Sequence, residues 1–298
     1  MKATTTNANY IKNALRMIEK AETIGAAAIA KLERMTAEDG KDRAKTIKGI
    51  RTSLRAAAQV KKILEKIDLR ESKTATPDER RALIRLVSIG KHTGGKIEGA
   101  ESIDGTCHCD FCEMMSKNPD FICAECYARG DQEQKKTSPQ IRHIMNAAIL
   151  SAILFSLADL RLLPISAQRV RFCEDGDTVN ETMGRNLLRI AKVNPAAAFG
   201  YWYKNRAAIK AAVTAEGKPR NVCFVQSSPI VGKPTEWDGI ADAIFTVYLN
   251  AVEVAEAIKR GAIPCNGIKC LVCGWHCYKA NKKGNGPAHV AELLRPQK

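Results

Sequence analysis

No stretch of this 298-residue sequence is both long and apolar enough to span a bilayer. The most apolar stretch, 147–163, is interrupted by Ser151, Ser156, Asp159 and Arg161, so we expect it to form a buried helix. The N-terminus is polar and lacks the apolar core of a secretory signal. We therefore expect a cytoplasmic protein without a membrane partner.

Two common catalytic signatures are also missing. We find no nucleophile–base pairing of the serine or cysteine hydrolase kind. The only candidate for a phosphate-binding glycine loop, Gly94-Gly95-Lys96, is too short to be one. These absences argue against a hydrolase of those classes and against a P-loop nucleotidase.

Acidic residues are scarce relative to basic ones. The chain has 47 Lys and Arg against 32 Asp and Glu, which gives a formal net charge of +15 and a pI near 9.4. Such a balance favours contact with a polyanion, most simply nucleic acid, although a generally basic protein is the alternative. Up to Gly90 there are 20 basic and 11 acidic residues, so +9 of the excess lies in this part.

Residues 1–75 are expected to form a separate basic helical hairpin. Residues 1–71 contain neither Pro nor Cys, and their apolar residues recur at helical spacing on both sides of a break at 36–40. The hairpin is either an arm that binds nucleic acid or another partner, or a solvated helical face.

Residues 76–298 are expected to form an α/β domain. Thr76-Pro77-Asp78-Glu79 is typical of a helix start. Alternating strands and helices follow, which predicts parallel pairing with right-handed crossovers, in an open sheet or a partial (β/α) barrel. The predicted strands are 169–173, 198–203, 222–225 and 244–249, and the predicted helices are 139–162, 181–192, 206–215, 237–243 and 251–260.

Polar residues follow each predicted strand, where active sites form in both kinds of sheet. The carboxylates Glu174, Asp175 and Asp177 could bind a cation, hold a substrate or transfer protons, or simply form a turn. We take Glu174, Asp177, Lys204 and Asn205 as candidate catalytic residues, and Ser227 and Ser228 as candidate cofactor contacts.

Nine of the eleven cysteines fall into two tight groups, as metal ligands do. In a reducing compartment such groups favour metal over disulfides. The spacing suits an iron–sulfur cluster, such as a 4Fe-4S cubane, or structural zinc. Tyr127 and Tyr278 each follow a cysteine and would shield the cofactor from water. The first group is Cys107, Cys109, Cys112, Cys123 and Cys126, and the second is Cys265, Cys270, Cys273 and Cys277.

Several short motifs, in a fixed order over residues 91–294, carry a family resemblance. They are Gly95-Lys96-Ile97, Ser116-Lys117-Asn118, Ile122-Cys123-Ala124-Glu125-Cys126-Tyr127-Ala128, Arg171-Phe172-Cys173-Glu174-Asp175-Gly176-Asp177, Lys192-Val193-Asn194-Pro195, Tyr203-Lys204-Asn205, Ser227-Ser228-Pro229, Phe245-Thr246-Val247-Tyr248 and the final segment from Cys265 to Tyr278. With these motifs the chain resembles the phage "gene product 88" domain family, which is found in phages, plasmids and mobile elements.

The resemblance implies a phage or mobile-element protein acting in the host cytoplasm, with a layout similar to that of radical S-adenosylmethionine enzymes. Those enzymes use Cys-x3-Cys-x2-Cys, whereas Cys270, Cys273 and Cys277 have these gaps in reverse order, which argues against S-adenosylmethionine. The leading hypothesis is an iron–sulfur protein, if an enzyme one that performs redox or radical chemistry on a nucleotide or nucleic acid. The alternative is a zinc-stapled, non-enzymatic protein that binds nucleic acid or a host factor.

Overall fold

The computed structural model describes residues 4–34, 40–93, 97–106, 110–124, 137–265, 270, 273, 277 and 286–293. Of the predicted site residues, Cys107, Cys109, Cys126, Tyr127 and Tyr278 lie outside these ranges. Within them, no helix is long and apolar enough to cross a membrane.

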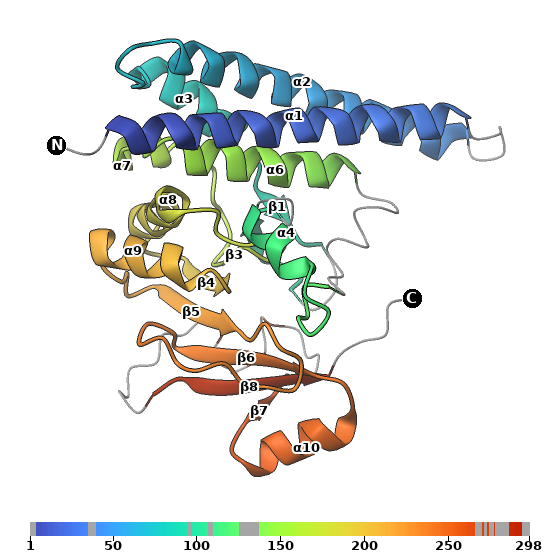
Figure 1. Ribbon diagram of the computed structural model, residues 1–298, viewed down its shortest axis with the longest axis vertical. Coiled ribbons are helices and arrows are strands. Elements are labelled where there is room, and N and C mark those ends of the chain that lie inside the picture. The colour runs from blue at the N-terminus through green and yellow to red at the C-terminus, as the bar shows by residue number, and fades with distance from the viewer. Residues whose placement is uncertain are drawn as a thin grey trace.

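A layer of helices forms one end of the molecule, at the top of Figure 1. The long helices α1 (Thr4–Arg34) and α2 (Gly40–Asp68) pack on each other and on α6 (Thr137–Ala152). Ile18 of α1, Leu64 of α2 and Ile144 of α6 are fully buried in one hydrophobic core, which continues to the sheet. The expected helical hairpin is therefore present, and it shares its core with the α/β part of the chain.

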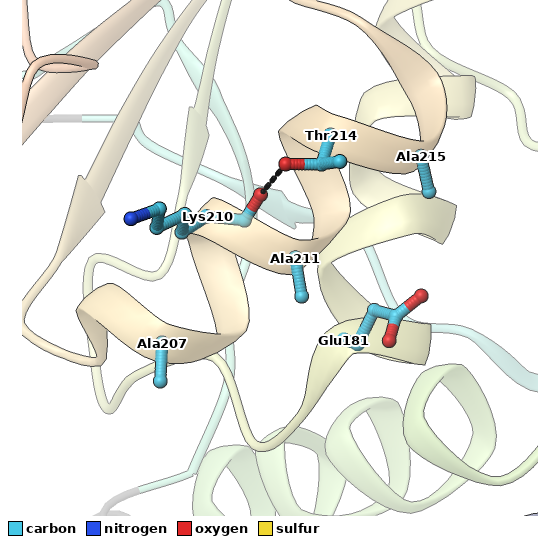
Figure 2. Close-up of a pocket in the computed structure, with 6 residues that line it drawn as sticks. All are labelled: Glu181, Ala207, Lys210, Ala211, Thr214 and Ala215. Atoms are coloured by element: carbon cyan, nitrogen blue, oxygen red, sulfur yellow. Dashed lines mark hydrogen bonds between the residues drawn. The ribbon is translucent and has the colours of Figure 1, made fainter.

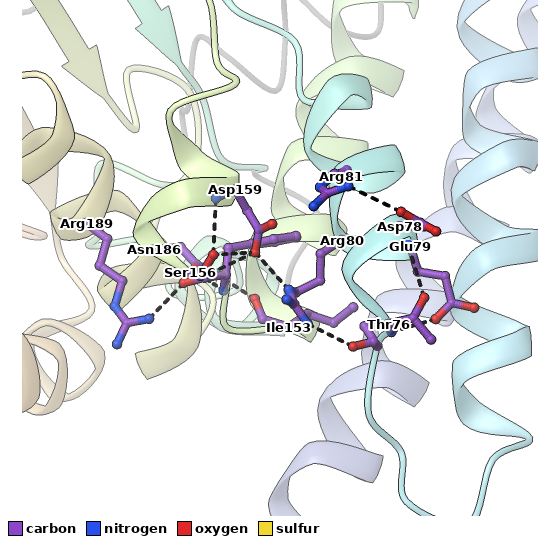
Figure 3. A network of polar contacts seen from close by, with 12 residues as sticks. Thr76, Asp78, Glu79, Arg80, Arg81, Ile153, Ser156, Asp159, Asn186 and Arg189 are labelled. Atoms are coloured by element: carbon purple, nitrogen blue, oxygen red, sulfur yellow. Dashed lines mark hydrogen bonds and ion pairs between the residues drawn. The ribbon is translucent and has the colours of Figure 1, made fainter.

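A network of polar contacts joins this layer to its neighbours (Figure 3). Helix α3 (Pro77–Leu86) begins at the predicted helix start, with a capping box in which Thr76 and Glu79 exchange hydrogen bonds. The short helix α7 (Leu157–Leu160) begins with a second box formed by Ser156 and Asp159. Arg80 Nε then donates to Asp159 Oδ2 at 2.8 Å and connects the two helices.

The sheet has eight strands in the order β1-β2-β3-β4-β5-β6-β8-β7. Only β1 pairs antiparallel, with β2; every other pair is parallel, so the predicted α/β class is confirmed. Among the described strands no pairing joins β7 back to β1, and the partial barrel stays a prediction. The strands are β1 (Gly90–Lys91), β2 (Glu101–Ile103), β3 (Arg169–Phe172), β4 (Ala198–Tyr203), β5 (Val222–Ser227), β6 (Ala243–Tyr248), β7 (Ile263–Pro264) and β8 (Ala288–Leu293).

One face of the sheet is covered by helices. From β2 to β6 each strand lies beside the one before it, and right-handed crossovers then place all the intervening helices on one side. Phe172, Tyr201 and Phe224 point into the main core on that side. The covering helices include α6, α8 (Glu181–Val193) and α9 (Arg206–Glu216), and α10 (Ala251–Lys259) follows β6.

The opposite face meets the second cysteine group. The second cysteine group lies between β7 and β8 in the chain. Cys265 and Cys277 pack on that face against Cys223 and Val225 of β5. A Cβ added to Gly200 of β4 would lie 2.5 Å from the carbonyl oxygen of Cys277, and the Arg169 guanidinium donates to the carbonyl of Cys270.

The sequence predicts most elements of the α/β part within two residues, but two helices are wrong. The predicted helix 139–162 is broken between α6 and α7, because Asn186 accepts from the amide of Phe155 and donates to the carbonyl of Ile153. No helix forms at 237–243, where Asp238 Oδ1 accepts from the amides of Ile240 and Ala241. The short strands β1 and β2 are not among the predicted strands.

Candidate functional site

Two histidines and three carboxylates gather at the carboxyl ends of β2 and β3. His92 follows β1, Asp104 follows β2, and Glu174 and Asp175 follow β3, while His143 comes from α6. Because the carboxyl ends of neighbouring parallel strands lie at one edge, residues far apart in sequence meet there. We call these five residues the edge cluster.

Asp104 organises the backbone of the edge cluster. Its Oδ1 accepts hydrogen bonds from the amides of Glu174 at 3.0 Å and Asp175 at 3.4 Å. Its Oδ2 accepts from the hydroxyl of Ser102 at 2.6 Å. The buried Asp104 therefore fixes where the loop after β3 presents its two acids.

The loop after β3 also has an unusual backbone. Cys173 has a φ of 55°, a left-handed conformation that costs energy in a residue with a side chain. Gly176 has a φ of 83°, and a Cβ there would lie 2.4 Å from the carbonyl carbon of Thr106. A β-bridge between Thr106 and Asp177 holds this close approach. The loop is thus locked against the end of β2.

The edge cluster contains three close histidine–carboxylate contacts. His92 Nε2 lies 3.1 Å from Glu174 Oε2. His143 lies between two acids, with Nε2 3.6 Å from Asp104 Oδ2 and Nδ1 3.7 Å from Asp175 Oδ2. The side chains of Asp175 and His92 remain 27% and 25% exposed, so solvent or a ligand can reach the cluster.

The surroundings push the pKa values of the acids in opposite directions. Burial, followed by the negative charge of Asp104, raises the pKa of Asp175 to about 6. Burial also opposes ionisation of Glu174, but contact with His92 and the charge of Arg171 outweigh it and lower the pKa of Glu174. Contact with Glu174 in turn raises the pKa of His92, although burial acts against this.

This arrangement suits proton transfer near neutral pH. A group transfers protons best when its pKa lies near the working pH, which Asp175 satisfies. Glu174 is held ionised and favours the protonated form of His92, which can then attract an anionic group. Opposite pKa shifts in two neighbouring acids are typical of acid–base sites.

Arg171 connects the edge cluster to the face that carries the second cysteine group. Its guanidinium carbon lies 3.9 Å from the ring centre of Trp202, and its charge acts on both Glu174 and Asp175. Trp202 packs in the same cluster as Cys277. The acid–base groups and this cysteine segment therefore border the same part of β3 and β4.

The candidate catalytic residues divide into two sets. Glu174 belongs to the edge cluster, whereas Asp177 is buried, and its Oδ2 accepts from the amides of Lys204 at 2.7 Å and Asn205 at 3.2 Å. Burial raises the pKa of Asp177, although the charge of Lys204 and these hydrogen bonds oppose the rise. Asn205 caps α9 and donates to the carbonyl of Thr178. The loops after β3 and β4 therefore meet at Asp177, Lys204 and Asn205.

The two candidate serines lie at the end of β5. Ser227 is its last residue and is half-buried. Ser228 is buried, lies 3.0 Å from the hydroxyl of Thr246 and accepts from the amide of Thr235 at 2.9 Å. These bonds fold the loop that follows β5.

The two described members of the first cysteine group lie on segments with different neighbours. Cys112 is part of α4 (Asp110–Ser116), which an ion pair between Glu113 and Lys20 attaches to α1. Cys123 follows Ile122, whose amide donates to the carbonyl of Pro229 at 2.7 Å. Cys123 therefore adjoins the loop after β5.

The thiols of both groups fit iron–sulfur or zinc chemistry by type and spacing. Cys112, Cys123, Cys265, Cys270, Cys273 and Cys277 are all half-buried. Among the described residues, no three His, Cys, Asp or Glu side chains converge as metal ligands. Three of the nine predicted ligands lie outside those residues, and the metal site stays a prediction.

Sequence reasoning missed His92, Asp104 and His143. His92 and Asp104 directly follow strands of only two and three residues, which are too short to show a period. His143 lies on a helix expected to serve the core. Histidine is scarce, with five in the chain, and this scarcity was the one available signal.

A shallow hollow between α8 and α9 offers less chemistry (Figure 2). Apart from Glu181 and Lys210 its lining is alanine and Thr214, whose hydroxyl donates to the carbonyl of Lys210 at 2.8 Å. We therefore take the edge cluster as the candidate site.

No protein-family model, curated protein or solved structure matches this chain. The resemblance to the gene product 88 family stays a prediction.

Proposed function

We propose that this chain is an iron–sulfur enzyme of a phage or mobile element that acts on a nucleotide or nucleic acid at the edge cluster. The observation that supports it best is the pair Glu174 and Asp175, whose pKa values are shifted in opposite directions. The pair lies at the carboxyl edge of the sheet, beside the face on which the second cysteine group packs. Open α/β sheets and partial barrels both bind their substrates at that edge.

Each residue of the edge cluster has a distinct role in this proposal. Asp175 gives or takes a proton, and His143 lies next to it, with Nδ1 3.7 Å from Asp175 Oδ2. Glu174 favours the protonated form of His92, which attracts an anionic group such as a phosphate. Asp104 holds the loop and does not react.

The two cysteine groups would hold the iron–sulfur cluster. A bound cluster supplies single electrons at a potential set by its surroundings. Cys270, Cys273 and Cys277, with ligands from the rest of the two groups, would hold it. The chain's own groups would exclude water and move protons.

Metal analysis of protein purified without oxygen tests the cofactor. We expect iron and sulfide in the protein and a broad absorption near about 400 nm that bleaches on reduction. Replacing Cys270 and Cys277 by Ser should remove the iron. The control is Cys173→Ala, which changes a buried cysteine of the main core, outside both groups and away from Cys265 and Cys277, and should keep the iron.

A separate experiment tests the edge cluster. The reduced protein is incubated with nucleoside triphosphates and with short DNA and RNA, with and without S-adenosylmethionine, and products are found by mass spectrometry. Glu174→Gln should abolish any product while iron is retained. Glu181→Gln, at the hollow between α8 and α9, is the matched control and should leave product formation unchanged. Equal product from the Glu174 variant would exclude the edge cluster as the site.

The second candidate is a zinc-stapled binding protein without enzymatic activity. The position of Cys265 and Cys277 favours it, because they cover a sheet face where another fold would place a helix. Structural zinc commonly replaces a missing core in this way. Colourless protein with stoichiometric zinc would establish this candidate and exclude the first.

A further inference from the structure

Four basic side chains of α2 form a row on the outside of the helical layer. Lys45, Lys48, Arg55 and Lys62 are all exposed. They are spaced by three, seven and seven residues, so at 3.6 residues per turn they fall on one side of the helix. The opposite side buries Ile50, Ala57 and Leu64. We call these four residues the α2 basic stripe.

Neighbouring charges are neutralised, whereas the stripe is not. Arg51 pairs with Glu33 at 3.0 Å, Lys61 with Glu22 at 2.9 Å and Lys66 with Glu79 at 3.5 Å. Within the part of the chain that the structure describes, no ion pair involves a member of the stripe. The stripe thus presents four unneutralised positive charges to solvent.

We propose that the α2 basic stripe binds the phosphate backbone of a nucleic-acid duplex. From Lys48 to Lys62 the stripe extends about 21 Å along a rigid helix, at 1.5 Å per residue. Such a row can follow successive phosphates, each of which releases a counterion on contact.

The side chains around the stripe argue against two other polyanions, single-stranded nucleic acid and an anionic membrane. Residues 40–68 contain no aromatic residue, so the surface has nothing on which unpaired bases could stack, as single-strand binding requires. A helix that lies on an anionic membrane inserts an apolar face, but the apolar face of α2 is buried against α1 and α6. A duplex bound through its backbone, without sequence preference, fits best.

This inference deepens the proposed function by naming the surface and the form of the nucleic acid. Its test needs neither metal nor turnover, so failure of the stripe and failure of the iron–sulfur proposal are distinguishable.

Fluorescence anisotropy with a labelled 24-base-pair DNA of random sequence tests the proposal on the full chain. The stripe variant carries Lys48→Gln, Arg55→Gln and Lys62→Gln. The control variant carries Lys210→Gln, Arg220→Gln and Lys259→Gln, three exposed residues on other surfaces. Both variants lower the net charge from +15 to +12, so only the location differs.

We expect the stripe variant to bind the duplex at least tenfold more weakly at 50 mM salt, and the control variant to change less than about threefold. The slope of log K against log salt should also fall by about 2.7 in the stripe variant, at about 0.9 for each lost phosphate contact. Circular dichroism of both variants should match that of the unmodified protein.

Other results would overturn the proposal. They are equal weakening in both variants, no duplex binding by the unmodified protein, tighter binding of the same sequence as a single strand, and stripe-dependent binding to vesicles with 30% phosphatidylserine but not to DNA.

Discussion

Asp175 lies where burial and a second carboxylate both oppose its ionisation. Its pKa is raised to about 6, so the folded state favours its protonated form. The stability that this provides is fully present below the pKa of the unfolded chain, about 4. It is lost as the pH rises through about 6.

Asp175→Asn should therefore stabilise the protein at neutral pH. The variant keeps a neutral side chain and avoids the cost of ionisation, up to about 3 kcal/mol for a shift of about two units. Urea unfolding at pH 4, 5, 6 and 7 measures this. The variant and the unmodified protein should differ little at pH 4 and diverge by pH 7. A difference that does not change with pH would contradict the raised pKa.

The pKa of Glu79 is shifted in the opposite direction to that of Asp175. The Arg70 guanidinium beside it lowers its pKa to about 2, with help from the amide of Thr76 and against the effect of burial. Its stabilisation is therefore present above pH 4.5 and is lost as the pH falls toward 2.

Glu79→Gln should cost about 1–3 kcal/mol at pH 7, because it removes the charge that pairs with Arg70, although the amide oxygen of Gln can still accept from the amide of Thr76. The loss should shrink as unfolding is measured at lower pH. Asp78→Asn is the matched control, since this neighbouring carboxylate is 93% exposed and should change stability by less than about 0.5 kcal/mol. Equal losses from both variants would refute the role of the Arg70 pair.

At the scale of elements, Gly200 lets the backbone of Cys277 lie directly on β4. A Cβ at this position would lie 2.5 Å from both the Cys277 carbonyl and the ring of Trp202. A glycine in a strand often marks such a close approach of another backbone.

Gly200→Val should displace the segment around Cys277 and lower the metal content per chain, without changing any cysteine. Ala211→Val adds side-chain volume at the outer hollow and is the control for general strain. Metal per chain and far-UV circular dichroism are measured together. Unchanged metal in the Gly200 variant would show that this close contact does not help to hold the site.

At the scale of the whole molecule, the hairpin and the α/β part share a core. Ile11 and Ile18 of α1 are buried with Ile141 and Ile144 of α6, and the same core continues to Phe172 of β3. A chain without residues 1–71 would expose α6, and we expect it to be insoluble or only loosely folded.

The full chain should accordingly unfold in one transition. All three tryptophans, Trp202, Trp237 and Trp275, lie in the α/β part, whereas much of the helical signal comes from α1, α2 and α6. Tryptophan fluorescence and circular dichroism at 222 nm should therefore give the same urea midpoint. A separate helical transition would show that the hairpin folds independently.

The sequence by itself determined the local elements of the α/β part. Strand β4 has the predicted bounds, α8 differs by one residue, and α3 begins at the predicted helix start. These features depend on periodicity and capping, which neighbouring residues determine. The helix predicted at 237–243 failed because side-chain bonds from Asp238 competed with the backbone pattern.

Only the tertiary structure decided which polar residues form the site. Glu174 and Asp177 are three residues apart, yet one contacts His92 and the other accepts the amides of Lys204 and Asn205. His143 reaches Asp104 from a helix in a different layer. The strand order and the direction of each crossover create these contacts. The strand order and the crossover directions depend on how distant segments of the chain pack together. The spacing of residues along the sequence does not determine that packing.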